Sequence, residues 1–349
     1  MVGDAALGGT ARPPSRVAPL ARLALRLLLS AAIVWILFTR IPVTEVGRVL
    51  RSVHAGYVLL AIALVPLYTY VGAAQQRLLT SHQGLALSTA RILEINIAAQ
   101  FYGLFLPGYL AGGVLRWYRM SRGGKAVGAL AAIAFNRLLE TLTLLLIGAV
   151  MWLLARPPRV DAMFTVLMLA ALAGAVGVVV ALFDGRVASR VGARIATMRW
   201  RWLPQGARAK VVESLQAAER FGTMPAGDVR RLAGLVLLRQ ALEFASFALM
   251  ALAVGIHVSL LALGWIRSFM ALALMLPIAF AGIGVREATL LLALEPYGVA
   301  AQSAIALSAL LLARYLLAAL GGGLWELRGV LLGKRASPDT QPPIPSTAD

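Results

Sequence analysis

The chain has 349 residues, of which 60% are hydrophobic and 14% charged, whereas soluble domains average about 45–50% apolar and about 25% charged residues. Its mean hydropathy of +0.81 agrees with this bias. The composition excludes a soluble enzyme and a disordered chain, and the absence of cysteine excludes a disulfide-stapled domain. An integral membrane protein remains. The net charge of +18 is typical of Lys- and Arg-rich cytoplasmic loops, so we predict no nucleic-acid partner.

Six apolar stretches are long enough for a transmembrane helix, which needs about 20 residues. They cover residues 20–38, 57–79, 126–154, 162–183, 229–254 and 301–327. The first stretch follows a basic segment and ends without a small-residue cleavage site. We therefore interpret it as an uncleaved anchor and not as a signal peptide.

Two further apolar stretches, residues 92–115 and 260–285, are interrupted by proline and glycine. Pro, Ala, Gly and Arg recur in them at the same spacing, which indicates an internal repeat; chance matching in an Ala-, Leu- and Gly-rich chain is the alternative. Proline removes a helical hydrogen bond and glycine lets the chain reverse. The pattern predicts two re-entrant helical hairpins, with kinked full spans as the alternative. The interrupting residues are Pro107, Gly108, Gly112 and Gly113 in the first copy and Pro277, Gly282 and Gly284 in the second.

Loop charges favour the re-entrant arrangement. With two hairpins and six full spans, 23 Lys and Arg residues fall on the cytoplasmic side and six outside, while four lie within apolar segments. This asymmetry obeys the positive-inside rule. It opens the first hairpin to the cytoplasm and the second to the outside, so the two copies form an inverted repeat.

The predicted fold is therefore an all-α polytopic membrane protein with about six full transmembrane helices and two re-entrant hairpins related as an inverted repeat. The transmembrane domain would cover residues 20–330, between a cytoplasmic tail (1–19) and a disordered tail (331–349). The repeat halves would be residues 57–183 and 229–330, joined by a basic cytoplasmic loop at 184–228.

Ionisable residues in apolar segments are costly, and each is a candidate functional residue. At about 1.5 Å per helical residue, Arg137 and Arg314 fall near the middle of the bilayer. Arg116 then reaches the cytoplasmic headgroup level and Arg286 the outer one. Such a series suits an anionic group that crosses the membrane, and the arginine fork matches the oxygens of a lipid phosphate.

Internal pairing is the alternative for these arginines. Glu140 follows Arg137 by three residues, and Glu243 follows Arg239 by four, spacings that place each pair on one helix face. We interpret Arg239 and Glu243 as a structural pair, and we assign Arg137 and Glu140 to function.

Other polar residues flank the two hairpins. Glu287 neighbours Arg286, and we expect it to compete for that arginine. Arg116 is followed by Arg119, Arg122 and Lys125, so a simple positive-inside cluster is an alternative for it. Asn96 and Gln100 share one helix face and either line a cavity or cap the interrupted backbone. The predicted headgroup-binding residues are Arg116, Arg137, Glu140, Arg286, Glu287 and Arg314.

At these motifs the sequence resembles the lysylphosphatidylglycerol synthase transmembrane region family, also called flippase-like membrane proteins. The similarity covers roughly residues 20–330. It rests on Phe105-Leu106-Pro107-Gly108, Gly112-Gly113, Arg116, Asn136-Arg137, Leu276-Pro277, Gly282 to Glu287, Tyr297-Gly298-Val299 and Arg314. The resemblance implies a lipid-translocating membrane domain. Full synthases continue into a soluble aminoacyl-transfer domain, whereas about 20 polar residues follow the last span here, so we expect no aminoacylation of lipid.

We therefore expect a protein of the bacterial inner membrane, with both termini cytoplasmic, that translocates lipids with an anionic headgroup. No P-loop motif occurs in the sequence, and we predict no catalytic residue, cofactor or metal. Protein partners remain unknown. The alternatives are an integral-membrane lipid- or glycan-modifying transferase and an accessory subunit of an envelope lipid pathway.

Overall fold

The computed structural model describes residues 43–105, 111–121, 125–156, 220–275 and 284–331, together with isolated positions between 166 and 177. All regular elements with defined bounds in these ranges are helices, as the predicted all-α class requires. Four of them are long and apolar enough to cross a membrane. They are α3 (Ala55–His82), α6 (Ala126–Ala155), α10 (Ala226–Ala253) and α13 (Ala301–Leu331).

These four helices coincide with four of the six predicted spans. The first predicted span lies outside the described residues, as does the fourth apart from isolated positions. Leucine-rich faces of the long helices are exposed: Leu59 of α3 is 68% exposed and Leu324 of α13 is 69% exposed. Such contiguous apolar surface is typical of helices that face lipid.

Both interrupted stretches form two helices. The first divides into α4 (Thr89–Phe105) and α5 (Ala111–Met120), and the second into α11 (Leu260–Ala273) and α12 (Val285–Leu294). The members of each pair contact each other. The predicted interruptions are thus confirmed, although four of the residues singled out for them, Pro107, Gly108, Pro277 and Gly282, lie outside the described residues.

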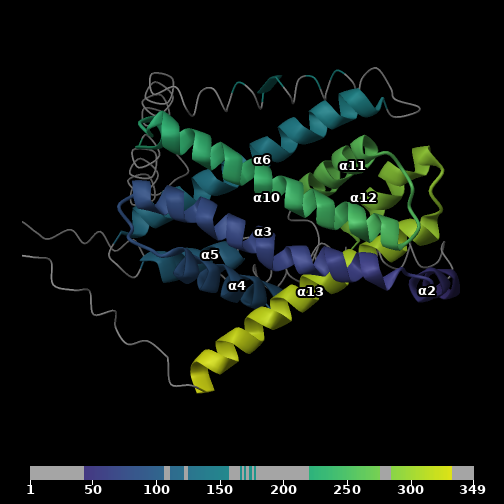
Figure 1. The fold of residues 1–349 in the computed structure, drawn as a ribbon, viewed down its shortest axis with the longest axis horizontal. Helices are drawn as coiled ribbons and strands as arrows, with labels where there is room; N and C mark the ends of the chain where they lie inside the picture. Colours follow the sequence, from purple (N-terminus) through teal and green to yellow (C-terminus); the bar gives the residue numbers. More distant parts are fainter. Residues whose placement is uncertain are drawn as a thin grey trace, which may run out of the picture.

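The described helices repeat in order and length. From α3 to α6 they have 28, 17, 10 and 30 residues, and from α10 to α13 they have 28, 14, 10 and 31. The contacts follow the same plan, because α3 packs on α10, α6 on α11, and α13 on α4. Figure 1 shows α4 and α5 on one side of the α3–α10 pair and α11 and α12 on the other.

Glycines allow close packing at the two crossings between the halves, where α6 meets α11 and α13 meets α4. Where α6 meets α11, a Cβ on Gly148 would lie 2.5 Å from the Cβ of Ser268. Where α13 meets α4, a Cβ on Gly322 would lie 2.5 Å from the carbonyl oxygen of Ile97. Small residues at such crossings are a general means of close packing between membrane helices.

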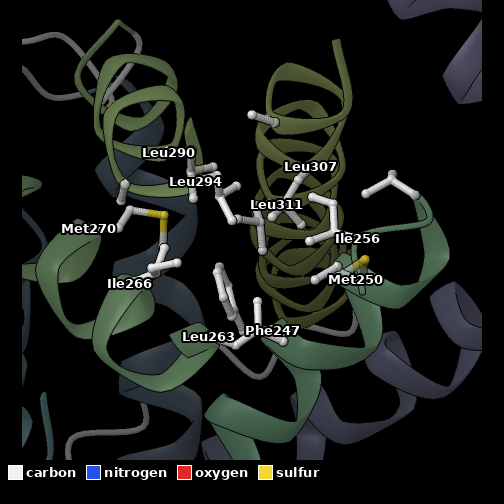
Figure 2. Packing of buried hydrophobic residues seen from close by; sticks show 14 of the residues in the cluster. Phe247, Met250, Ile256, Leu263, Ile266, Met270, Leu290, Leu294, Leu307 and Leu311 are labelled. Carbon is white, nitrogen blue, oxygen red and sulfur yellow. The ribbon is translucent and has the colours of Figure 1, made fainter. Parts of the chain in front are cut away.

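The largest hydrophobic cluster lies in the second half. Side chains from α10, α11, α12 and α13 converge there, as Figure 2 shows for Phe247, Leu263, Leu290 and Leu307. The short helix α2 (Val43–Arg51) contributes Val46 to this cluster and contacts α13. The cluster holds α11 and α12 against the long helices and so fixes the polar residues that they carry.

Candidate functional site

Polar side chains of α6 and α10 face each other inside the helix bundle. On α10, Arg239, Gln240 and Glu243 recur at a spacing that places them on one helix face. On α6, Arg137 and Glu140 are three residues apart and also lie on one helix face. Because the helix segments on either side of these residues are largely apolar, the facing residues find partners in one another and not in solvent.

An ion-pair chain links three helices at this point. Glu140 of α6 accepts a hydrogen bond from Nη1 of Arg239, and Nε of Arg239 donates to Glu243 at 3.0 Å. Glu243 also accepts a hydrogen bond of 2.7 Å from Arg267 of α11. The predicted pair of Arg239 and Glu243 is therefore confirmed, but it is part of a longer chain.

Amide side chains extend the network. Gln75 of α3 donates to Asn136 at 2.7 Å, and the amide of Asn136 donates to Glu140 at 2.8 Å. On the other side, Gln240 accepts a hydrogen bond of 2.9 Å from Arg267. These bonds keep both glutamates fixed between their arginine partners. Asn136 thereby contacts the site through Glu140.

A cavity of about 200 Å³ opens on this network. Its charged lining consists of Arg137, Arg239 and Arg267 together with Glu140 and Glu243. Three arginines thus face two carboxylates, so the cavity carries an excess positive charge. Arg137 is the most exposed of the three, with 39% of its side chain accessible, and its Nη1 lies 3.7 Å from Glu140. The ion pair that was the alternative for these two residues is thus present, but Glu140 bonds more closely to Arg239.

Arg314 reaches the network from α13. Its Nη1 donates a hydrogen bond of 2.6 Å to Ser246 of α10, whose hydroxyl donates in turn to the carbonyl of Ala61 at 2.8 Å. The charge of Arg314 also acts on Arg267. Arg314 is thus held at the junction of α3, α10 and α13.

Each interrupted stretch carries one further arginine that interacts electrostatically with a tyrosine of α13. Arg116 of α5 and Arg286 of α12 both lie within electrostatic range of Tyr315 of α13. Their predicted positions at opposite surfaces of the bilayer stay a prediction. In the folded chain α5 packs on α4 and α6, and α12 packs on α11 and α13.

Glu287 has a different set of partners from the one predicted. Its carboxylate accepts a hydrogen bond from the N–H of Gly284 at 2.6 Å and another from Ser308 of α13, also at 2.6 Å. The first bond caps the start of α12, and the second fastens it to α13. Within the described ranges, no hydrogen bond joins Glu287 to Arg286.

The remaining predicted residues that the structure describes on the first interrupted stretch lie in α4 and α5. Asn96 has a buried side-chain oxygen without a hydrogen-bond partner among the described residues, whereas Gln100 is half-buried. A Cβ on Gly112 would lie 3.2 Å from the carbonyl oxygen of Ala99, so this glycine allows α5 to approach α4. Gly113 has open space around it.

Sequence reasoning missed the role of Arg267 and Gln240. Arg267 is 7% exposed and provides the third arginine of the cavity. It lies in the middle of a short apolar helix, and a lone charge in such a helix is the signal that could have identified it. In the described part of the chain, no group of three or more His, Asp or Glu side chains is placed to hold a metal ion.

The long apolar helices and the charged network between them define a polytopic helical membrane protein with a polar centre. The sequence pattern of one family, the lysylphosphatidylglycerol synthase TM region, matches residues 23–322. The chain belongs to this family, as its motifs predicted, and a membrane-lipid-related function is consistent with that membership. Neither the curated proteins nor the solved structures include a significant match.

Proposed function

We propose that this protein translocates lipids with an anionic, phosphate-bearing headgroup between the leaflets of a membrane. The observation that supports this most strongly is the excess of arginine in the buried network. The network and its neighbours contain six arginines and only three glutamates. They are Arg116, Arg137, Arg239, Arg267, Arg286 and Arg314, with Glu140, Glu243 and Glu287.

An uncompensated charge inside a bilayer costs several kcal/mol, on the order of 3 per residue on insertion scales. A bound anion would supply the missing negative charge. Arginine remains charged in such surroundings, and its planar fork matches phosphate oxygens. A lipid headgroup would bring this phosphate while its acyl chains stay among the exposed leucines of the long helices.

We further propose that the two halves form an inverted repeat in the bacterial inner membrane, with six full spans, two re-entrant hairpins and cytoplasmic termini. The repeated helix order supports this proposal, as do the contacts of α6 with α11 and of α13 with α4.

The residues that follow the two short helices allow a test of this arrangement. Ser121 follows α5 directly, and Glu295 follows α12 directly. Because the chain has no cysteine, Ser121→Cys and Glu295→Cys can be labelled singly. An impermeant maleimide should reach Ser121→Cys from the cytoplasmic side only and Glu295→Cys from the outer side only. Labelling of both from one side would exclude the inverted arrangement.

Translocation can be measured in liposomes with lipids that carry a fluorophore on the headgroup, quenched from outside with dithionite. Wild type is expected to expose the inner-leaflet pool of anionic lipid. Arg137→Gln and Arg314→Gln should slow this exchange at least tenfold, the change expected from losing one charge-assisted hydrogen bond. Arg231→Gln is a matched control, because Arg231 is an exposed arginine of α10 two turns before Arg239.

The lipid series decides what the network recognises. Exchange of anionic lipids that exceeds exchange of an uncharged lipid would support headgroup recognition. Wild type that exchanges no anionic lipid, although it is folded and inserted, would overturn the proposal and favour the transferase or accessory alternatives.

A further inference from the structure

The three arginines of the cavity differ in how closely a carboxylate holds them. Arg239 donates hydrogen bonds to Glu140 and Glu243, and Arg267 donates one of 2.7 Å to Glu243. The Nη1 of Arg137 lies 3.7 Å from Glu140, and 39% of the Arg137 side chain is accessible. That distance is longer than a hydrogen bond. An anion in the cavity can therefore contact Arg137 with the least loss of existing ion-pair contacts.

Glu140 is placed to pair with Arg137 more closely than it does. The two residues are three apart on α6, a spacing at which opposite charges pair on one helix face. Oε2 of Glu140 lies on the side of Arg137, whereas Oε1 accepts hydrogen bonds from Arg239 and, at 2.8 Å, from the amide of Asn136. These two donors on one oxygen keep the carboxylate at its distance from Arg137.

A second amide fixes the orientation of Asn136. An ionised carboxylate only accepts hydrogen bonds, so Asn136 has to present its NH₂ group to Glu140. Its carbonyl oxygen then accepts a hydrogen bond of 2.7 Å from the NH₂ group of Gln75, a fully buried residue of α3. Neither amide is among the residues that line the cavity, so both act on it through Glu140.

We propose that Asn136 and Gln75 are positioning residues for anion binding. They hold Glu140 on Arg239 and so prevent it from closing onto Arg137, which contacts one phosphate group of the ligand in the cavity. This proposal rests on the proposed function. It deepens that function by naming the arginine that meets the phosphate and the two amides that control its internal competitor.

Loss of either amide should let the carboxylate turn. Without the bond from Asn136, Oε1 of Glu140 keeps only Arg239 as a donor, and Oε2 can form a direct ion pair with Arg137. A phosphate group then has to displace this ion pair before it can bind. The expected result is weaker binding, although every arginine of the cavity is still present.

The binding test uses the full chain, purified in an uncharged detergent, and isothermal titration calorimetry with dioctanoyl phosphatidylglycerol. Asn136→Leu should weaken binding about three- to tenfold, and Gln75→Met about two- to fivefold, since each loses one hydrogen bond of the relay. Gln76→Met is the matched control, because Gln76 is the buried neighbour of Gln75 and contacts Met120 instead of the network. Equal weakening in Gln75→Met and Gln76→Met would overturn the proposal.

Double variants separate positioning from a general structural role. Glu140→Gln removes the competing charge and should tighten binding at least threefold. In that background Asn136→Leu should change the affinity less than twofold, because no carboxylate is left to close onto Arg137. A structural amide would weaken binding equally in both backgrounds, and that result would overturn the proposal.

A second background keeps the test decisive if Glu140→Gln does not fold. In Arg137→Gln the residue for which Glu140 and the phosphate compete is absent. Asn136→Leu should then leave the residual affinity unchanged within twofold. A further tenfold loss in this background would overturn the proposal.

Two further probes identify the source of the phosphate. Dioctanoylglycerol lacks phosphate, and wild type that binds it as tightly as the phospholipid would overturn the proposal. If inorganic phosphate binds as tightly as the phospholipid, the cavity takes a soluble phosphate; if only the phospholipid binds, it takes a headgroup. Either result supports the proposal when the affinity depends on Asn136 in the presence of Glu140 only.

The liposome assay keeps the two proposals apart. If wild type and Asn136→Leu bind the phospholipid and exchange anionic lipid equally well, translocation stands and the positioning role is wrong. If binding follows the expected pattern of single and double variants but no lipid is exchanged, the positioning role stands and translocation is wrong.

Discussion

The two halves of the molecule use the same order of helices but place different side chains at corresponding points. We compare positions counted from the first residue of each helix. The fourteenth residue is Arg239 in α10 and Tyr68 in α3. The fifteenth residue is Glu140 in α6 and Tyr315 in α13. Where α10 and α6 carry an ion pair, α3 and α13 therefore carry two tyrosines. A repeated backbone plan does not require repeated chemistry. Here one side of the centre is ion-paired, whereas the corresponding positions of the other side carry neutral hydroxyl groups.

A second pair of corresponding positions shows the same division. The twenty-first residue is Gln75 in α3 and Ser246 in α10. Gln75 bonds to the uncharged Asn136 of α6, whereas Ser246 accepts from the charged Arg314 of α13. Each half thus joins its first long helix to its last by one polar bridge, but only the second bridge carries a charge.

The largest expected effect distinguishes Glu140 from its counterpart. Glu140→Gln removes the carboxylate that faces Arg239 and Arg137, so that Arg239 keeps only Glu243 as a paired carboxylate and the buried network gains net positive charge. Loss of one member of a buried ion pair costs about 3–5 kcal/mol. Tyr315→Phe, the matched change in the other half, should cost less than about 1 kcal/mol. Equilibrium unfolding in mixed micelles, followed by tryptophan fluorescence, measures the unfolding free energy of both variants. Equal losses of unfolding free energy would contradict the expected difference between the two halves.

The helix crossings should respond alike in both halves. Gly322→Ala places a methyl group against the carbonyl oxygen of Ile97, and Gly148→Ala places one against Ser268. Overpacking of this kind costs about 1–3 kcal/mol. Gly321→Ala is the control, because its Cβ meets open space, and alanine should be neutral or stabilise the helix by up to about 1 kcal/mol. The same unfolding assay measures all three, and a stable Gly322→Ala variant would contradict the close crossing.

The two polar bridges should differ by their charge. Ser246→Ala removes the acceptor of Arg314, and hydrogen bonds to charged groups contribute about 1.5–3 kcal/mol. Asn136→Ala removes the neutral acceptor of Gln75, but it also removes a donor to Glu140. We therefore compare Ser246→Ala with Gln75→Ala, for which about 1 kcal/mol is expected. A larger loss of unfolding free energy in Gln75→Ala than in Ser246→Ala would contradict this expectation.

The smallest expected effect concerns ion pairs at the edge of the bundle. Arg119 of α5 donates to Glu326 of α13 at 2.7 and 2.9 Å, and both side chains are about one-fifth exposed. Arg119→Gln should cost about 1 kcal/mol. Arg91→Gln, which breaks an exposed pair with Glu94 on α4, should cost less than about 0.5 kcal/mol. Added salt should reduce the Arg91 effect more than the Arg119 effect when unfolding is repeated at two ionic strengths.

Much of the fold could be predicted because its signals are local in the sequence. Apolar length identified α3, α6, α10 and α13 within a few residues. Proline and glycine identified the interruptions between α4 and α5 and between α11 and α12. The spacing of Arg239 and Glu243 predicted their contact, since residues four apart lie on one helix face.

The site was harder to predict because its contacts join distant segments. Nothing local indicates that Glu140 bonds to Arg239 in preference to Arg137, or that Arg267 completes the cavity. The depth of Arg116 and Arg286 was counted along straight helices from the prolines, and it stays a prediction. That count includes the length of α5 and α12 but not the direction in which they pack, which depends on the whole bundle.

The glycine crossings also determine which sequence changes can occur together. At Gly323 a Cβ would lie 2.5 Å from the ring of Phe101, and at Gly148 the nearest atom belongs to the side chain of Ser268. A larger residue at either glycine can be accommodated only if its partner becomes smaller. Among related sequences we therefore expect positions 323 and 101, and positions 148 and 268, to vary in size in opposite directions. The pairs are far apart along the chain, so such covariation would mark the two crossings in relatives that have no structure.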